Sequence, residues 1–373
     1  MELESILSIF LYIAIGAMCL MAAATAKKTP KLSFWFIVIT LTLLAGFRHP
    51  YVGIDTLPYV NHIMSLLESF SWKLNNIDEP GFIIVSYVVV GLTKSYTAVL
   101  TVFAFITNYF MVKRLFELRE DISFPWAIFI YICQYYFMTF NILRQWVAMA
   151  IVFYYSKYIM EGKKGAFKFI LAVAVSITFH KTAFITLALL PLYWLVRKSR
   201  TVVNQIFKLL MIGVSPVVLA ALLVYMSKVY GDVYGNINTQ GLSFINVARV
   251  AFMVFIAVMT AIDKHHVKKK NDDMPVLQDS EMLATKDIEI FDIAVMFVGI
   301  VFALMTLLYK YADRLGMYFI IFEMIVLPRY IKNSKFKIFV MVFVLFIFMY
   351  LRINSFMSSG QGEMPYIPFW AAQ

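Results

Sequence analysis

The chain has 373 residues, of which 62% are hydrophobic and only 15% are charged. Soluble domains contain roughly 45–50% apolar and about 25% charged residues, so a soluble globular enzyme is excluded. The counts of 15 Gly and 11 Pro also exclude a fibrous repeat and a disordered chain. The apolar residues would fill about eleven or twelve helical spans of ~20 residues each. We therefore predict an all-α, polytopic membrane protein surrounded by membrane lipids.

The net charge is +11, from 33 Lys and Arg against 22 Asp and Glu. In a soluble protein this excess would point to nucleic acid. In a polytopic protein it indicates cytoplasmic Lys and Arg residues that orient the spans, so no nucleic-acid partner is expected. The two cysteines, Cys19 and Cys133, both lie in apolar runs and support neither a disulfide framework nor a metal site. No cofactor is expected.

The first apolar run, 5–26, ends in small residues that resemble a signal-peptide cleavage site. However, Glu2 and Glu4 precede this run, and Lys27 and Lys28 follow it. A secretory signal peptide carries its positive charges before the apolar segment. We therefore expect a retained first span that begins outside the cytoplasm and ends inside it.

Further apolar runs alternate with short polar segments along the chain. In order, the runs cover residues 5–26, 33–47, 81–93, 97–112, 123–140, 143–160, 165–180, 182–196, 206–229, 243–262, 288–308, 314–330 and 337–351. Basic clusters between these runs mark the cytoplasmic side. The clusters are Lys27/Lys28/Lys31, Lys113/Arg114/Arg119, Lys163/Lys164/Lys168, Arg197/Lys198/Arg200/Lys208, Lys264/Lys268/Lys269/Lys270 and Lys332/Lys335/Lys337.

All of these clusters can face the cytoplasm only if one run between 48 and 112 does not cross the bilayer. Run 81–93 is the shortest candidate, and its length suits an interfacial or re-entrant helix better than a crossing. The remaining runs give about twelve transmembrane helices in a single transmembrane domain, 1–373, with both termini outside. This topology leaves an outer loop at 48–80 and a cytoplasmic loop at 263–287.

Four polar motifs fall on the outer side of this topology. They read FRHPYVGIDTLPY at 47–59, DEPGF at 78–82, FNILRQ at 140–145 and FHKTA at 179–183. The first two motifs also admit a structural interpretation. Arg48 could extend its charge to lipid headgroups, Asp55 could cap the helix that follows it, and Glu79 suits the positive end of a helix dipole.

Two further arginines extend the pattern. Arg249 lies inside the run 243–262, where a charge costs a few kcal/mol and indicates function by default. Arg314 begins the run 314–330. Together with Arg48 and Arg144, these arginines at outer span ends indicate an anionic ligand, because guanidinium binds phosphate through two parallel hydrogen bonds.

With these motifs the chain resembles the EpsG family of Wzy-like exopolysaccharide polymerases. The resemblance rests on FRHPYVGIDTLPY, DEPGF, FNILRQWVAMAI and FHKTAF, and on the later YADRLGMYF and MPYIPF. It implies a GT-C-like membrane glycosyltransferase in the bacterial inner or plasma membrane. Such an enzyme joins oligosaccharide repeat units carried on undecaprenyl pyrophosphate at the extracytoplasmic face. A separate chain-length regulator is a possible partner.

The reaction that the resemblance implies needs groups that stabilise negative charge and a base. Arginines stabilise the leaving pyrophosphate, and the candidates are Arg48, Arg144, Arg249 and Arg314. A base activates the acceptor hydroxyl, and the candidates in order are Asp55, His180 and Glu79. Contacts to sugar or phosphate are expected from Asn141, Gln145, Tyr59 and Lys181.

Two alternatives stay open at the level of sequence. An O-antigen ligase would use the same lipid-linked donor and differ only in its acceptor. A transporter of lipid-linked oligosaccharide or polysaccharide would place charges near the middle of the membrane at broken helices. Here the charges lie mainly at the outer boundary, which favours the polymerase.

Overall fold

The computed structural model describes residues 3–70, 79–196, 251–252, 255, 280–305, 312–358 and 360–371. The elements in this part of the chain are helices, which confirms the all-α prediction, and an isolated antiparallel β-bridge joins Arg48 to Pro368. The chain divides into two compact units. Unit 1 comprises Met1–Thr186 with Met324–Gln373, and unit 2 comprises Leu187–Glu323.

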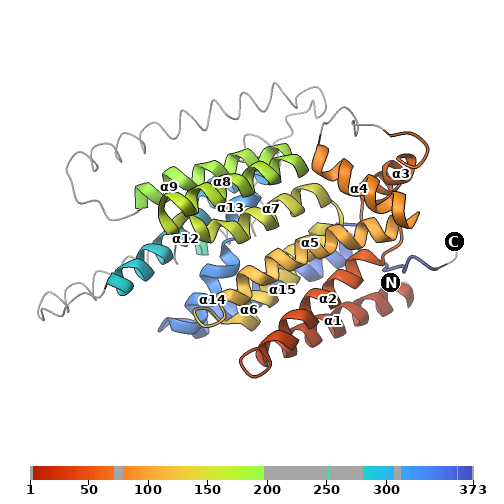
Figure 1. The fold of residues 1–373 in the computed structure, drawn as a ribbon. Helices are drawn as coiled ribbons and strands as arrows, with labels where there is room; N and C mark the ends of the chain where they lie inside the picture. Colours follow the sequence, from red (N-terminus) through yellow and green to blue (C-terminus); the bar gives the residue numbers. More distant parts are fainter. Residues whose placement is uncertain are drawn as a thin grey trace, which may run out of the picture. The chain divides into compact units, whose positions relative to one another are not determined.

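The described α-helices of unit 1 overlap the predicted runs, except α3, which falls in the expected outer loop 48–80. They are α1 (Leu3–Ala24), α2 (Pro30–Gly46), α3 (Thr56–Ser65), α4 (Pro80–Thr93), α5 (Tyr96–Glu117), α6 (Phe124–Ile130), α7 (Leu143–Tyr155), α8 (Gly162–Phe179), α14 (Glu323–Asn333) and α15 (Lys337–Ser358). Helix α5 packs against both α2 and α7, and α7 also packs against α8 (Figure 1). Because α7 is buried along nearly its whole length, it forms the centre of this unit.

One predicted run, 123–140, is not a single regular helix. After α6 the chain forms a π-helical turn, Tyr131–Tyr135, and then a 3₁₀ helix, Tyr136–Phe140. Buried tyrosine hydroxyls hold this irregular segment, since Tyr136 donates to the Leu41 carbonyl at 2.6 Å and Tyr131 donates to Asn108 Oδ1 at 2.8 Å. Irregular helical turns of this kind are common at functional sites. Here the segment leads directly into the FNILRQ motif.

Within the described part of the chain, three helices are long and apolar enough to cross a membrane, namely α1, α5 and α15, which indicates a membrane protein. Shorter apolar helices cover Pro30–Gly46, Pro80–Thr93 and Lys181–Val196. The second of these matches the short helix expected at 81–93. The count of twelve spans stays a prediction, because run 206–229 and most of run 243–262 lie outside the described residues.

In unit 2, α9 (Leu189–Val196) and α13 (Ala312–Ile320) both pack against α12 (Ser280–Met305). Gly299 allows the close approach of α12 and α13, because a Cβ at Gly299 would lie 2.7 Å from the Ile320 Cα. The predicted span 314–330 is divided here, since α13 ends at Ile320 and α14 begins at Glu323. An acidic residue suits the start of a helix, which explains the restart at Glu323. Residues 263–279 of the expected cytoplasmic loop lie outside the described part of the chain.

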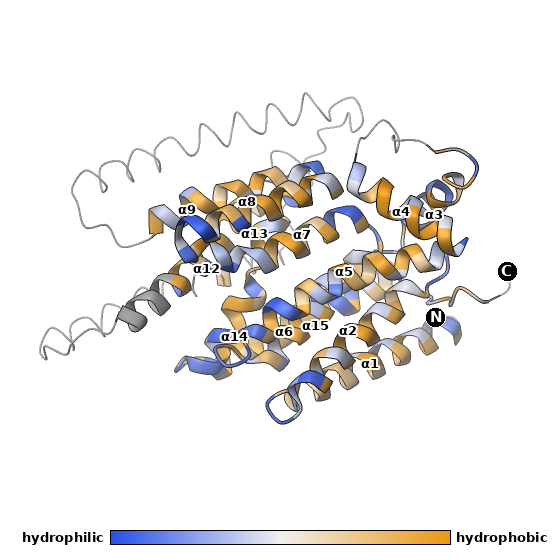
Figure 2. Ribbon diagram, viewed as in Figure 1, coloured by the Kyte–Doolittle hydropathy of each residue, from blue (hydrophilic) through white to orange (hydrophobic). Residues whose placement is uncertain are grey.

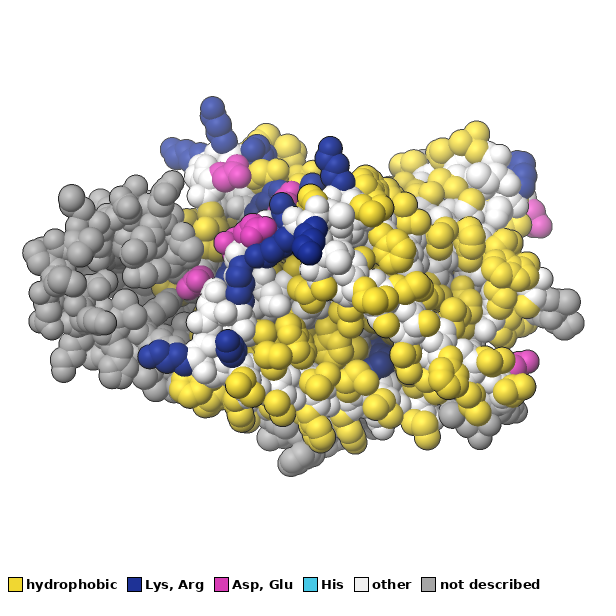
Figure 3. Space-filling model, turned by 90° about the horizontal axis from the view of Figure 1, so that it is seen from below, with side chains coloured by type: hydrophobic (Ala, Val, Ile, Leu, Met, Phe, Trp, Pro, Cys, Tyr) yellow, Lys and Arg dark blue, Asp and Glu magenta, His cyan; other side chains and the backbone are white. Residues whose placement is uncertain are grey.

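Basic loops meet at one end of unit 1. Lys27, between α1 and α2, lies 3.6 Å from the carboxylate of Glu120, and Lys332 of α14 donates to the Glu120 carbonyl. Hydrophilic residues concentrate at the helix ends and loops (Figure 2), and Lys and Arg gather in one region of a broadly hydrophobic face (Figure 3). Helix α2 begins at this end and α5 finishes there. The residues after α2 and before α5 therefore lie at the other end of unit 1.

Candidate active site

The carboxylate of Glu79 contacts two side chains, Arg144 and His180, at that other end of unit 1. Its Oε2 atom accepts a hydrogen bond from Arg144 Nη1 at 2.6 Å, and its Oε1 atom lies 2.8 Å from His180 Nδ1. Only 1% of the Glu79 side chain is exposed, against 16% for Arg144 and 18% for His180. The carboxylate is therefore buried beneath a cation and an imidazole that both remain accessible.

Local sequence explains how Glu79 becomes available for these contacts. It directly precedes α4, which starts at Pro80 because proline favours the first helical position. The Glu79 side chain makes no capping hydrogen bond to α4. Gly81 then brings α4 against the end of α8, since a Cβ at Gly81 would lie 3.0 Å from the Cβ of Thr178. This close approach places Glu79 beside His180, which directly follows α8.

Arg144 lies in the first turn of α7, between two aromatic rings. Its guanidinium carbon is 5.7 Å from the ring centre of Tyr59 and 5.9 Å from that of Phe82, and its Nε lies 3.5 Å from the Tyr59 hydroxyl. Its Nη2 donates to none of the described residues. Arg144 can therefore hold Glu79 and still present hydrogen-bond donors to a ligand.

Helix ends shape the electrostatics of this cluster. The N-termini of α3, α4 and α7 meet here, and each contributes partial positive charge that favours an anion. His180 instead follows the C-terminus of α8, where partial negative charge favours a cation. The arrangement can therefore stabilise an anionic group beside Arg144 and a positive imidazolium at His180.

The surroundings of α3 shift the pKa values of two of its side chains, Tyr59 and His62. Burial raises the pKa of the Tyr59 hydroxyl, so Tyr59 stays protonated and can donate a hydrogen bond to a ligand oxygen. Burial and, secondly, the charge of Arg144 lower the pKa of His62. His62 is therefore a neutral imidazole at pH 7. Its buried Nε2 has no hydrogen-bond partner within the described structure.

Arg48 is fully buried and its donors are used within the chain. Its Nε lies 3.2 Å from Thr56 Oγ1, its Nη2 lies 3.1 Å from the Phe140 carbonyl, and its Nη1 donates to the Ala45 carbonyl. Its guanidinium also lies 4.7 Å from the Phe140 ring centre. Burial lowers the pKa of Arg48 to about 10, so the group remains charged at neutral pH. In this position Arg48 ties the end of α2 to the segment before α7.

The other predicted site residues lie around the same motifs. Asp55 is half-buried at the start of α3, which its side chain does not cap, and its N–H lies 3.4 Å from Asn141 Oδ1. Gln145 is buried at 2% exposure in the first turn of α7. Lys181 is exposed directly after His180. Their expected contacts to sugar and phosphate stay predictions.

The remaining two predicted arginines fall outside the described residues of unit 1. Arg249 lies outside the described residues. Arg314 is exposed in the first turn of α13, which belongs to unit 2. Their predicted contributions to the same anionic site therefore stay predictions.

Comparison with known protein families decides the affiliation of the chain. A family model described as the EpsG family matches residues 31–369, which is nearly the whole sequence. The chain belongs to the EpsG family. No curated protein and no solved structure matches it. EpsG-family membership indicates a role in polysaccharide biosynthesis.

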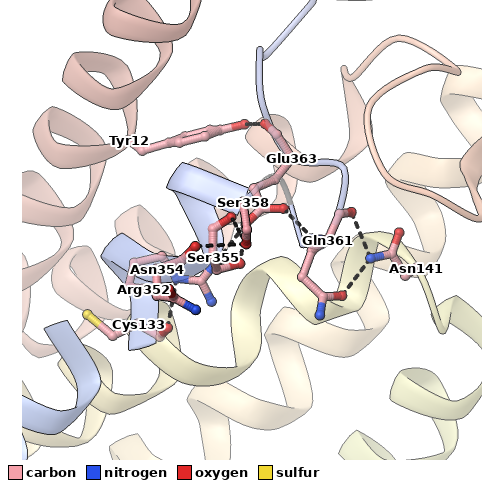
Figure 4. A network of polar contacts seen from close by, with 9 residues as sticks. All are labelled: Tyr12, Cys133, Asn141, Arg352, Asn354, Ser355, Ser358, Gln361 and Glu363. Carbon is pink, nitrogen blue, oxygen red and sulfur yellow. Dashed lines mark hydrogen bonds and ion pairs between the residues drawn. The ribbon is translucent and has the colours of Figure 1, made fainter. Parts of the chain in front are cut away.

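A second buried ion pair in this EpsG-family chain was not singled out from its sequence. Arg352, near the end of α15, lies 3.2 Å from Glu363, and the two side chains are 10% and 0% exposed (Figure 4). Arg352 Nε also donates to the Cys133 carbonyl at 2.8 Å. A detectable signal was an arginine directly after the apolar run 337–351 with an acidic residue shortly downstream. No group of three or more His, Cys, Asp or Glu among the described residues could hold a metal ion.

Proposed function

We propose that this protein is a polysaccharide polymerase that joins undecaprenyl-pyrophosphate-linked oligosaccharide repeat units outside the cytoplasm. The observation that carries the proposal is the double contact of Glu79 with Arg144 and His180. These residues come from three separate motifs of the chain. Such a cluster offers a cation for the leaving group and an imidazole for the acceptor hydroxyl. Family membership supports polysaccharide as the product.

In the proposed reaction, a hydroxyl oxygen of the acceptor sugar attacks the anomeric carbon of the donor sugar. A new glycosidic C–O bond forms, and the bond between that carbon and the pyrophosphate oxygen breaks. Its electron pair leaves with undecaprenyl pyrophosphate, whose growing charge Arg144 stabilises. The hydroxyl proton passes to His180 Nε2, so atoms and charge balance.

His180 is the proposed base because its contact with Glu79 fixes its tautomer. In the neutral ring, Nδ1 carries the proton and donates it to Glu79 Oε1, which leaves Nε2 as the acceptor. Nε2 makes no hydrogen bond to any residue that the structure describes. Glu79 then stabilises the imidazolium that forms, as a carboxylate does behind a catalytic histidine. Asp55, near Tyr59 at the start of α3, is the second candidate base.

Arg144 is the proposed contact for the leaving pyrophosphate. Arg48 is less suited to that role because its guanidinium is buried and bonded to the chain. Tyr59, whose hydroxyl faces Arg144, can donate to the same phosphate or to a sugar. Arg249, Arg314, Gln145 and Lys181 remain proposed ligands of lower rank.

The distribution of charge supports an extracytoplasmic site. The basic loops meet at the end of unit 1 opposite the cluster, and such loops remain in the cytoplasm. The Glu79 cluster then faces the extracytoplasmic side, where the lipid-linked repeat units are joined in the proposed reaction. A GT-C-like arrangement of about twelve spans with both termini outside, in a single domain in the inner or plasma membrane, completes the proposal.

The cellular test is the replacement Arg144→Lys, with Lys168→Ala as its control. Lys168 also pairs with a carboxylate, Glu161 at 3.3 Å, but at the basic end. Arg144→Lys is expected to accumulate single lipid-linked repeats outside the cytoplasm, while Lys168→Ala makes normal polymer. Normal chain lengths in Arg144→Lys would end the assignment. Accumulation on the cytoplasmic face would indicate a transporter, and normal polymer that stays on its lipid would indicate a ligase.

A further inference from the structure

The residues after α15 form a segment, 360–371, that we call the C-terminal clasp. Its anchor is Glu363, whose side chain is fully buried. Oε1 of Glu363 accepts a hydrogen bond from Ser355 at 2.6 Å and pairs with Arg352, and Oε2 accepts the Gln361 N–H at 2.9 Å (Figure 4). The Glu363 carbonyl also accepts the Tyr12 hydroxyl at 2.6 Å. The clasp is therefore fixed to both α15 and α1.

From this anchor the clasp pairs with the residues that follow α2. The His49 N–H donates to the Ile367 carbonyl at 2.8 Å, and the Phe369 N–H donates to the Phe47 carbonyl at 2.9 Å. The rings of Phe47 and Phe369 lie 5.4 Å apart. An isolated antiparallel bridge thus holds the first part of the 47–59 motif against the MPYIPF motif.

Two glycines bring the clasp directly against the turn before α3. The Gly53 N–H donates to the Gly362 carbonyl at 2.7 Å. Both residues have positive φ, +96° at Gly53 and +67° at Gly362. A Cβ at Gly362 would lie 2.9 Å from the Ile54 nitrogen, and a Cβ at Gly53 would lie 3.0 Å from Asn141 Oδ1. A side chain at either glycine would therefore separate the clasp from the site or displace Asn141.

Asn141 connects the clasp to the active-site segments. Its Nδ2 donates to the backbone carbonyl of Gln361 at 2.9 Å and to the Gln361 side chain at 2.7 Å. Its Oδ1 accepts the Asp55 N–H at 3.4 Å. Only two residues separate Asn141 from Arg144, so one amide links the clasp, the start of α3 and the start of α7.

We infer that the C-terminal clasp is a positioning element of the active site and that Asn141 is the positioning residue through which it acts. The clasp sets α3, which carries Tyr59, against α7, which carries Arg144. This inference rests on the proposed function. It gives Asn141 a role other than the sugar or phosphate contact that the sequence suggests, because both amide hydrogens already bind the clasp.

The main test compares Gly362→Ala with Gly360→Ala, two identical substitutions within one segment. A Cβ at Gly360 meets only the rotatable hydroxyl groups of Ser358 and Ser355, at 3.2 and 3.9 Å. Each change is made in full-length Val52→Cys protein, because Val52 is fully buried within the loop that pairs with the clasp and both native cysteines are also buried. Purified protein is then assayed for maleimide labelling and for joining of undecaprenyl-pyrophosphate-linked repeats.

Gly362→Ala is expected to expose the thiol introduced by Val52→Cys and to lower kcat about 10- to 100-fold, because small displacements of catalytic groups slow the reaction. Gly360→Ala is expected to change neither. Labelling of the introduced thiol with a normal kcat would overturn the positioning role. A normal kcat without labelling would show that Gly362 is not needed to hold the clasp against the 47–59 motif, which would also overturn the inference. Equal losses of kcat in both alanine variants would also overturn it.

A second pair of variants tests Asn141 even if Gly362→Ala fails to fold. Asn141→Asp cannot donate to Gln361, so kcat is expected to fall, and adding Gln361→Lys restores an attraction between the same two positions. Recovery of kcat in the double variant supports positioning, since a lost sugar contact would not be restored by a change at residue 361. No recovery, or full activity of Asn141→Asp alone, would contradict the inference. A fully active Arg144→Lys enzyme would refute the proposed function separately.

Discussion

Glu79 and His180 lie 101 positions apart in sequence, yet Glu79 Oε1 and His180 Nδ1 are 2.8 Å apart. The contact brings the start of α4 and the end of α8 together. Because the other oxygen of the same carboxylate holds Arg144, one buried group fixes both the proposed base and the proposed phosphate contact. Any change at Glu79 is therefore expected to disturb both His180 and Arg144.

Glu79→Gln is expected to lower kcat about 100-fold or more, since general-base catalysis contributes 10²- to 10⁴-fold and depends on the tautomer that Glu79 fixes. Glu79→Asp keeps the charge and should retain intermediate activity. The matched control is Glu117→Gln, because Glu117 also pairs with a cation, Lys157 at 2.5 Å, but at the basic end of the helices. Rates measured on lipid-linked repeats check this prediction, and equal losses in both Gln variants would contradict it.

Arg48 and Arg144 should respond differently to the same change. Arg48→Lys loses the fork that reaches Thr56 and two carbonyls, and leaving buried partners unsatisfied costs about 1–3 kcal/mol each. Arg144→Lys keeps the ion pair with Glu79 but loses the planar fork for phosphate. We expect a lower melting temperature for Arg48→Lys, and a normal one with about 10²-fold less activity for Arg144→Lys. A lower melting temperature for Arg144→Lys, together with normal stability and low activity for Arg48→Lys, would contradict these assignments.

His62 makes the stability of α3 sensitive to acid. Its pKa is lower in the folded protein than the ~6.5 of the unfolded chain, so below that pH the unfolded state binds more protons. Stability from this group is complete above about pH 6.5 and declines as the pH falls. His62→Gln removes this dependence. Melting temperatures from pH 8 to pH 5 should fall more steeply for the native protein, and parallel curves would contradict the prediction.

Membrane sidedness can be tested on one helix. Lys163 and Lys181 are exposed at opposite ends of α8, at its basic start and directly after His180. The thiol introduced by Lys181→Cys should react with an impermeant maleimide in intact cells. The thiol introduced by Lys163→Cys should react only after the membrane is opened. The opposite result would place the Glu79 cluster in the cytoplasm, where a polymerase of lipid-linked repeats cannot work.

Sequence predicted the helical fold well because long apolar runs indicate buried helices directly. The bounds of α1, α2 and α5 lie within a few residues of the predicted runs. The irregular segment 131–140 was not foreseen, because its shape depends on tyrosine hydroxyls that bond to distant groups such as Leu41. Hydropathy alone carries no information on such contacts.

The sequence indicated which residues belong to the candidate site, but not which contacts they make with one another. Glu79, Arg144 and His180 were all named from polar motifs predicted on the outer side, and the structure brings them together. Sequence could not show that the Arg48 guanidinium donates its hydrogen bonds to other residues of the chain. It also could not show that Arg352 and Glu363 anchor the C-terminal clasp. Those facts depend on the packing of segments that are far apart in sequence.

The most direct measurement is repeat-unit joining by the purified, membrane-reconstituted protein supplied only with undecaprenyl-pyrophosphate-linked repeats. The account predicts a ladder of long chains from the native protein and single repeats from His180→Gln. A protein that makes no chains under these conditions, or a His180→Gln variant that makes the same ladder at the same rate, would contradict it.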